Sequence, residues 1–167
     1  DEQGHDILTE SRRKDGSWNY TQTNRYDDNG HLVENTTRNN FGQYGNTYEY
    51  DAEGRQVKST YTSNDKLFSI TEVAYNDKGM PVYRKETYPE MRRVSEYYTT
   101  YNEKGEENGN RNYVNDENGY RLCSSDSTFT DKKGLVHRIQ YSNYDNRPKT
   151  MEGTFNKLDY LTHYEYF

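Results

Sequence analysis

The chain has few aliphatic residues and no long hydrophobic run. Leu, Ile, Val and Phe together account for only 22 of its 167 residues, below the roughly one-fifth share under which disorder is the usual outcome. No stretch approaches the ~20 apolar residues of a membrane helix, so no transmembrane segment is predicted. The single Cys123 excludes an internal disulfide framework and a cysteine-rich zinc site.

The chain also lacks a concentration of charge of one sign. Its 22 basic and 28 acidic residues are interspersed, and the net charge is only -6, so self-repulsion is weak. Binding to a nucleic-acid backbone needs a clustered basic surface. The densest basic pairs, Arg12 with Arg13 and Arg92 with Arg93, stand near acidic residues, and we expect no nucleic-acid partner.

Tyrosine is the residue that is abundant. The chain has 19 Tyr, and its aromatic share of 15% is far above that of disordered chains. We therefore expect an ordered protein in which tyrosines do most of the packing. The length suits one domain or one elongated array.

A short turn-like motif recurs along the chain. An aromatic residue is followed by Asp or Asn, by variable residues and by Gly. Four close copies and two looser ones are present: Tyr26-Asp27-Asp28-Asn29-Gly30, Tyr50-Asp51-Ala52-Glu53-Gly54, Tyr75-Asn76-Asp77-Lys78-Gly79, Tyr101-Asn102-Glu103-Lys104-Gly105, Phe129-Thr130-Asp131-Lys132-Lys133-Gly134 and Phe155-Asn156-Lys157-Leu158-Asp159. Their last residues are 24, 25, 26, 29 and 25 positions apart. A period of about 25 residues indicates a repeat array.

Turn chemistry accounts for the motif without a ligand. Asp or Asn is favoured at the first position of a type I turn, where its side chain accepts hydrogen bonds from turn amides. Gly is favoured at the last position, where the chain takes a positive φ and returns to a strand through a bulge. A second set of polar turns, such as Lys14-Asp15-Gly16, divides each repeat into two strands.

The predicted fold is therefore all-β. About thirteen strands joined by short turns form an antiparallel β-meander. Because aliphatic residues are scarce, we expect an extended, twisted, largely single-layer sheet rather than a sandwich or a closed barrel. No segment has a sustained helical stripe, and the one place where a helix is left open is near Asp6 to Arg13.

The motif resembles a known repeat. Tyr50-Asp51-Ala52-Glu53-Gly54-Arg55 is similar to the YD repeat of bacterial Rhs and teneurin-type proteins, and the two-stranded unit resembles MORN-like β-hairpin repeats. The resemblance extends over residues 24–167, which we interpret as the repeat array, with residues 1–23 as N-terminal strands and lead-in to a single domain. It implies a small secreted bacterial β-repeat domain, and supplies no catalytic residues.

The first residue of the sequence is relevant to the cellular location of the protein. The chain begins at Asp1, without Met, as a mature protein does after a signal peptide is removed, although a recombinant start would look the same. We therefore expect an extracytoplasmic location, whether secreted, periplasmic or at the cell surface.

No cofactor or metal is expected. The four histidines, His5, His31, His137 and His163, are far apart and have no metal-ligand spacing. Acidic turns such as Asn115-Asp116-Glu117-Asn118-Gly119 could offer oxygens to calcium, but none matches a calcium-binding loop, and turn chemistry accounts for them.

No nucleophile elbow, P-loop or dinucleotide motif is present, and we expect no catalytic residues. A chain with 28 acidic residues can always supply two carboxylates, so the alternative is a small hydrolase of envelope polysaccharide that uses an Asp/Glu pair.

The leading hypothesis is a non-enzymatic protein with a Tyr-rich surface for contact with a protein or a glycan. The candidate face comprises Tyr44, Tyr48, Tyr50, Tyr61, Tyr97, Tyr101, Tyr141, Tyr164 and Tyr166, and Tyr98 is a further ring of the same kind. The alternative is that these rings serve the sheet's own cross-strand packing. A C-terminal edge strand with Tyr160, Tyr164, Tyr166 and Phe167 also predicts a possible edge-strand dimer.

Overall fold

The structure is a computed structural model that describes residues 2–142, 149–155 and 161–166, the last two ranges by their backbone. Contacts between Cα atoms divide the chain into two compact units. The first comprises Asp1–Val73 and Glu86–Met91, and the second comprises Ala74–Lys85 and Arg92–Phe167. The described part of the chain holds no helix that could span a lipid bilayer.

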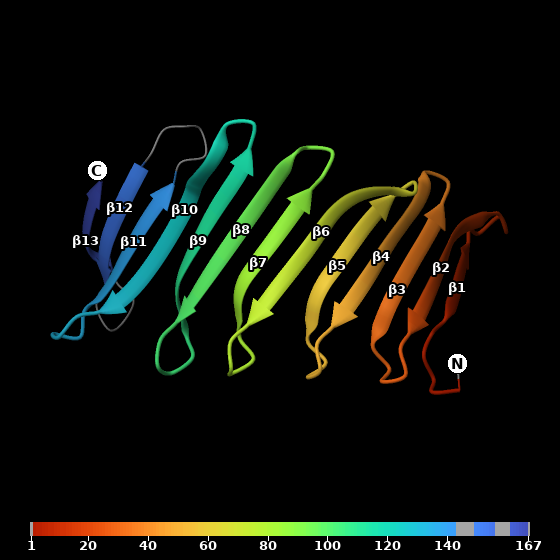
Figure 1. Cartoon of the computed structure of the whole chain (residues 1–167), viewed down its shortest axis with the longest axis horizontal. Coiled ribbons are helices and arrows are strands. Elements are labelled where there is room, and N and C mark those ends of the chain that lie inside the picture. Colours follow the sequence, from red (N-terminus) through yellow and green to blue (C-terminus); the bar gives the residue numbers. More distant parts are fainter. Residues whose placement is uncertain (1, 143–148, 156–160, 167) are drawn as a thin grey trace. The chain divides into compact units, whose positions relative to one another are not determined.

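Each unit is a single layer of antiparallel strands (Figure 1). The first strands along the chain are β1 (Leu8–Arg12), β2 (Trp18–Tyr26), β3 (Leu32–Asn39), β4 (Gly42–Tyr50), β5 (Gln56–Ser63) and β6 (Lys66–Tyr75). They are followed by β7 (Pro81–Tyr88), β8 (Arg93–Tyr101), β9 (Glu107–Asp116), β10 (Gly119–Thr130), β11 (Val136–Ser142), β12 (Lys149–Phe155) and β13 (Leu161–Tyr166). Within each unit, strands that are neighbours in the chain are neighbours in the sheet. The predicted all-β antiparallel meander is confirmed.

The segment from Asp6 to Arg13, for which a helix was left open, is extended instead. Leu8–Arg12 forms β1, which pairs with β2 through Leu8 opposite Thr23 and Thr9 opposite Gln22. The segment is too short for a stable isolated helix, and the sheet satisfies its backbone groups through β2.

The repeated motif forms the predicted turn. At the first copy, Asp27 Oδ1 accepts hydrogen bonds from the backbone N of Asn29 at 2.9 Å and of His31 at 2.8 Å. The backbone N of Gly30 donates to the Asp27 carbonyl at 3.0 Å, and Gly30 has a φ of 83°. The same side-chain pattern recurs at Asp51, Asn76, Asn102 and Asp131. The copy that ends at Asp159 lies outside the described residues.

The sequence pattern of the turn recurs once more in the N-terminal segment, which the prediction left out of the array. Asp1-Glu2-Gln3-Gly4-His5 matches Asp27-Asp28-Asn29-Gly30-His31 in sequence, and Gly4 has a φ of 86°. The His5 ring stacks on Tyr26 at 4.4 Å between centroids, as His31 stacks on Tyr50 at 4.7 Å. The motif begins with the aromatic residue that precedes each Asp or Asn, which is why it did not reveal this copy.

Neighbouring turns in a unit are held together by the residue that follows each glycine. A Cβ placed on Gly54 would lie 3.0 Å from His31 Nε2, and one on Gly30 would lie 3.4 Å from the His5 ring. The Tyr50 hydroxyl donates to the Leu32 carbonyl at 2.8 Å. The turn glycine therefore supplies both a positive φ and room for the side chain of the preceding repeat.

Full burial is confined to a small part of the second unit. Among the described side chains only Ser95, Val114 and Cys123 are fully buried, at 1%, 3% and 4% exposure. Arg121 and Asp116 form a two-pronged ion pair beside them, at 2.7 and 3.0 Å. A layer this thin agrees with the scarcity of aliphatic residues, and polar side chains provide much of the packing.

Candidate binding site

Strands β8, β9 and β10 bring one set of side chains onto a common face. Glu96, Tyr98 and Thr100 share a face of β8, because alternate residues of a strand point to the same side. Arg111 on β9 stands opposite Tyr98, and Ser125 on β10 stands opposite Arg111. The same face thus continues across three strands of the second unit.

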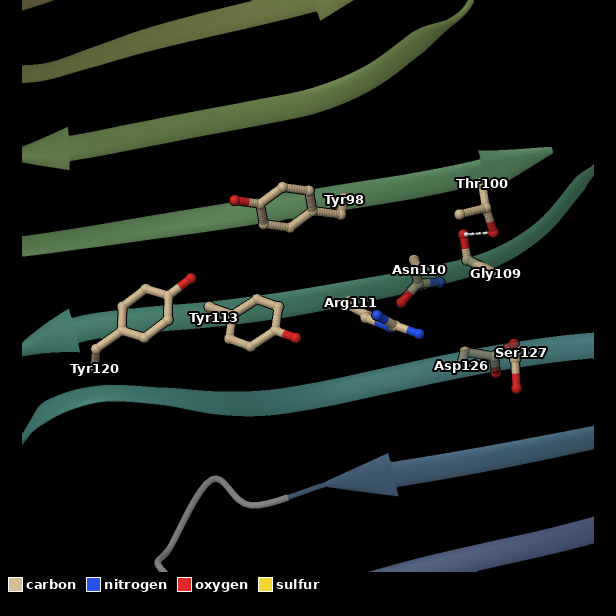
Figure 2. Close-up of a pocket in the computed structure, with 9 residues that line it drawn as sticks. All are labelled: Tyr98, Thr100, Gly109, Asn110, Arg111, Tyr113, Tyr120, Asp126 and Ser127. Atoms are coloured by element: carbon tan, nitrogen blue, oxygen red, sulfur yellow. Dashed lines mark hydrogen bonds between the residues drawn. The ribbon is translucent and has the colours of Figure 1, made fainter.

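This face carries an open hollow with a volume of about 520 Å³. Its lining residues are Tyr98, Thr100, Gly109, Asn110, Arg111, Tyr113, Tyr120, Asp126 and Ser127. Figure 2 shows the three tyrosines toward one end of the hollow and Thr100, Gly109 and Ser127 toward the other. The hollow therefore has an aromatic end and a polar end.

The aromatic end belongs to a row of four tyrosines, Tyr83, Tyr98, Tyr113 and Tyr120, which we call the tyrosine ladder. The ring centroids of Tyr83 and Tyr98 are 5.0 Å apart, and those of Tyr98 and Tyr113 are 5.8 Å apart in an edge-to-face arrangement. Tyr113 and Tyr120 are stacked at 5.4 Å with an interplanar angle of 4°. Cross-strand contacts of this kind fix the rings without a deep core.

Glu96 ties the ladder together through its carboxylate. The Tyr83 hydroxyl donates to Glu96 Oε1 at 2.6 Å. Desolvation and a hydrogen bond to Glu96 raise the pKa of Tyr120 to about 12, so this hydroxyl stays protonated at neutral pH. The Tyr120 side chain remains 57% exposed and that of Tyr98 37% exposed, which leaves ring surface for a ligand.

The polar end is open because position 109 has no side chain. A Cβ on Gly109 would lie 2.9 Å from Thr100 Oγ1 and 3.1 Å from the Asp126 carbonyl oxygen. The Thr100 hydroxyl donates to the Gly109 carbonyl at 3.3 Å. Backbone and small hydroxyl groups thus line this part of the hollow.

Only two lining residues are charged. Asp126 Oδ2 accepts hydrogen bonds from Arg138 Nε and Gln140 Nε2, both at 2.8 Å. Its register partner on β9 is Asn110, so its side chain lies on the face opposite that of Arg111. Arg111 is exposed and makes no hydrogen bond or ion pair with a described residue. The charge that faces the hollow is therefore positive.

The predicted binding residues of the first unit fall into two groups. Tyr44 and Tyr48 share a face of β4, and Tyr61 shares it too because it stands opposite Asn46. Tyr61 also contacts Phe68 edge-to-face at 5.6 Å. Tyr50 instead holds its own repeat to the one before it through Leu32.

In the second unit, only part of the predicted set belongs to the face with the hollow. Tyr97 points to the opposite face from Tyr98, and the Arg84 guanidinium lies over its ring at 4.3 Å. Tyr101 donates to the Pro81 carbonyl at 2.8 Å, which is the repeat-to-repeat contact seen at Tyr50. Tyr141 stands opposite Ser125 and so shares the face of Arg111.

The remaining predictions concern the C-terminal edge. Tyr164 and Tyr166 belong to β13, whose side chains are outside the described structure, and Tyr160 and Phe167 lie outside the described residues. The edge-strand dimer therefore stays a prediction.

The described histidines take part in local contacts. His31 Nδ1 lies 3.1 Å from Asp27 Oδ2, and His137 Nε2 lies 3.2 Å from Asp131 Oδ2. No group of three or more His, Cys, Asp or Glu in the described residues is placed to hold a metal ion. His163 lies in β13, beyond the described side chains.

Sequence reasoning missed the ladder. Tyr83, Tyr113 and Tyr120 were absent from the predicted face, and Tyr98 was named only as a further ring beside it. The spacing of Gly109, Arg111 and Tyr113 could have indicated this face, since alternate residues of a strand share a side. It places a position without a side chain, a cation and an aromatic ring next to one another. It could not show which strands carry the adjoining residues.

Comparison with known proteins gives structural likenesses but no family. No protein-family model matches the chain, and no curated protein matches it. A crystal structure of a porin-like protein from Bacteroides uniformis aligns with 89% of this chain and 58% of its own length, at 15% identity and a TM-score of 0.39. The chain thus spans somewhat more than half the length of that protein, and a likeness at this level identifies no family.

Proposed function

We propose that this chain is a non-enzymatic binding module that holds a short glycan in the hollow of β8, β9 and β10. The observation that carries the proposal is the pairing of exposed tyrosine rings with a polar end on one face. A sugar ring has an apolar C–H face, which stacks on an aromatic ring, and hydroxyl groups, which need hydrogen-bonding partners. The tyrosine ladder supplies the first, and the hydroxyls of Thr100 and Ser127 supply the second.

The size of the hollow favours a glycan over a protein. Its volume of about 520 Å³ lies in the range of ~300–1,000 Å³ of small-ligand sites. A stable protein interface buries roughly 800 Å² on each partner around an apolar, well-packed centre. The described lining residues offer tyrosines and polar groups and include no aliphatic side chain.

The carboxylates near the hollow favour binding over hydrolysis. Glycoside hydrolysis ordinarily uses two carboxyl groups that flank the bond to be cleaved. The lining includes one acidic residue, Asp126, and its carboxylate is bound by Arg138 and Gln140. Glu96 holds the hydroxyls of Tyr83 and Tyr120.

The test compares two adjacent tyrosines on opposite faces of β8. A panel of oligosaccharides is screened, and binding of the best one is measured by calorimetry for the wild type, Tyr98→Ala and Tyr97→Ala. We expect Tyr98→Ala to weaken binding about tenfold or more, as the loss of a central aromatic contact does. Tyr97→Ala should leave affinity within about twofold, because its ring lies on the far face.

A third variant and a product assay complete the design. Tyr120→Ala removes a ring that is 57% exposed, so it should weaken binding while circular dichroism stays unchanged. No reducing ends should be released from the bound oligosaccharide. Equal losses for Tyr97→Ala and Tyr98→Ala, or a screen in which no glycan binds, would contradict the proposal.

A further inference from the structure

We infer that the ligand of this site is an anionic sugar, one that carries a carboxylate or a sulfate group. The inference rests on the proposed function and adds the chemical class of the glycan. It follows from the position of Arg111, the charge at the centre of the hollow.

The sheet register sets the neighbours of Arg111. It stands opposite Tyr98 on β8 and opposite Ser125 on β10, and the next residues on the same side of β9 are Gly109 and Tyr113. In Figure 2 Arg111 lies between the tyrosines and the polar end of the hollow. A sugar stacked on the rings would therefore place a substituent beside the guanidinium.

Arg111 forms no ion pair with a described side chain. The other charged lining residue, Asp126, is bound by Arg138 and Gln140, and its side chain lies on the opposite face. Glu96 shares the face of Arg111 and keeps its negative charge, but its carboxylate accepts hydrogen bonds from the hydroxyls of Tyr83 and Tyr120 and makes no ion pair with Arg111. The hollow thus presents a guanidinium that forms no ion pair with a described residue.

The groups around Arg111 suit an anion. A guanidinium donates two parallel hydrogen bonds to a carboxylate or a sulfate, and such charge-assisted bonds are about twice as strong as neutral ones. The hydroxyls of Thr100 and Ser127 line the same end. The missing side chain at Gly109 leaves room there, since a Cβ would come within 2.9 Å of Thr100 Oγ1.

The experiment compares ligands that differ only in charge. Binding of trigalacturonate and of its fully methyl-esterified form is measured by calorimetry at low ionic strength, alongside dextran sulfate and dextran. We expect each anionic ligand to bind about tenfold or more tightly than its neutral counterpart. Added salt should reduce this difference, because the cation is exposed. The pair with the larger difference in affinity shows whether the site prefers a carboxylate or a sulfate.

Two variants assign the difference to one residue. Arg111→Gln should remove the preference for the anion, whereas Arg111→Lys should keep part of the preference. Arg38→Gln is the control, since it removes the same charge from an exposed position in the first unit that makes no ion pair with a described residue. It should not change the preference.

The possible outcomes separate this inference from the proposed function. Equal binding of the acid and its ester, or equal effects of Arg111→Gln and Arg38→Gln, overturns the inference and leaves glycan binding intact. An acidic peptide such as hexaglutamate that binds as tightly as trigalacturonate also overturns it, because charge alone would then suffice. If neither the anionic nor the neutral glycans bind, the proposed function fails and the inference fails with it.

Discussion

Substituting alanine at two turn glycines, Gly16 and Gly54, separates the energetic cost of backbone strain from the cost of losing contact between repeats. Gly16 and Gly54 have nearly the same φ, 80° and 77°, so alanine should be strained equally at both. They differ in their surroundings. A Cβ on Gly16 meets nothing within 4 Å, whereas one on Gly54 would lie 3.0 Å from His31 Nε2.

The magnitudes follow from these two geometries. Alanine in the left-handed region costs about 1–2 kcal/mol, and about 0.4–1 kcal/mol of this is offset because alanine also restricts the unfolded chain. Gly16→Ala should therefore lower the free energy of unfolding by about 1 kcal/mol. Gly54→Ala should cost a further ~0.5–1.5 kcal/mol, because it displaces the His31 ring from its stack on Tyr50.

The assay is equilibrium unfolding in urea followed by the fluorescence of Trp18, the chain's one tryptophan. Trp18 lies in β2 of the first unit, as both glycines do. A His31→Ala background completes a double-mutant cycle, and in that background Gly54→Ala should cost no more than Gly16→Ala. Equal costs for the two glycines in the wild type, or an unchanged cost of Gly54→Ala in the His31→Ala background, would refute the role given to His31.

Three further outcomes follow from the structure. Hydrogen bonds from Arg121 lower the pKa of Asp116 from 3.8 to about 2. The stability that Asp116 contributes is therefore present above pH ~4 and is lost as the pH falls toward 2, so Asp116→Asn should lower the urea midpoint at pH 7 and flatten this acid dependence; an unchanged acid loss would contradict the ion pair's role. Cys123, only 4% exposed, should react with Ellman's reagent in concentrated urea and resist it in native buffer, and rapid reaction in native buffer would show that the site is open. Tyr50→Phe should lower the free energy of unfolding by about 0.5–1.5 kcal/mol through the loss of its hydroxyl hydrogen bond. Tyr48→Phe is its control, since the Tyr48 hydroxyl makes no hydrogen bond with a described residue, and equal effects of the two would argue against that bond.

The turns were predictable because their chemistry is local. Asp27 bonds to amides two and four residues ahead, and Gly30 needs only its own φ. Such features leave a motif in the sequence wherever they occur. The N-terminal copy at Gly4 escaped notice because the motif begins with an aromatic residue, although its Asp-x-x-Gly-His pattern is intact.

The motif tyrosines have a second role, contact with the preceding repeat, which was harder to predict from the sequence. The hydroxyl of Tyr50 bonds to a carbonyl 18 residues earlier, and that of Tyr101 to one 20 residues earlier. The sequence shows that an aromatic residue is required at these positions. It does not show that the ring and the hydroxyl contact the preceding repeat.

The sequence by itself determined an all-β repeat with a period of about 25 residues and few apolar side chains to bury. Only the tertiary structure decided which side chains meet on one face. The register of β9 and β10 shifts between Leu122 and Ser124. Without that shift, Asp126 would share the face of Leu122 and Arg111; with it, Asp126 turns away and Ser125 and Ser127 take that face. One extra residue in a strand reverses the side to which all later residues point, so the charge of the hollow depends on pairing between strands.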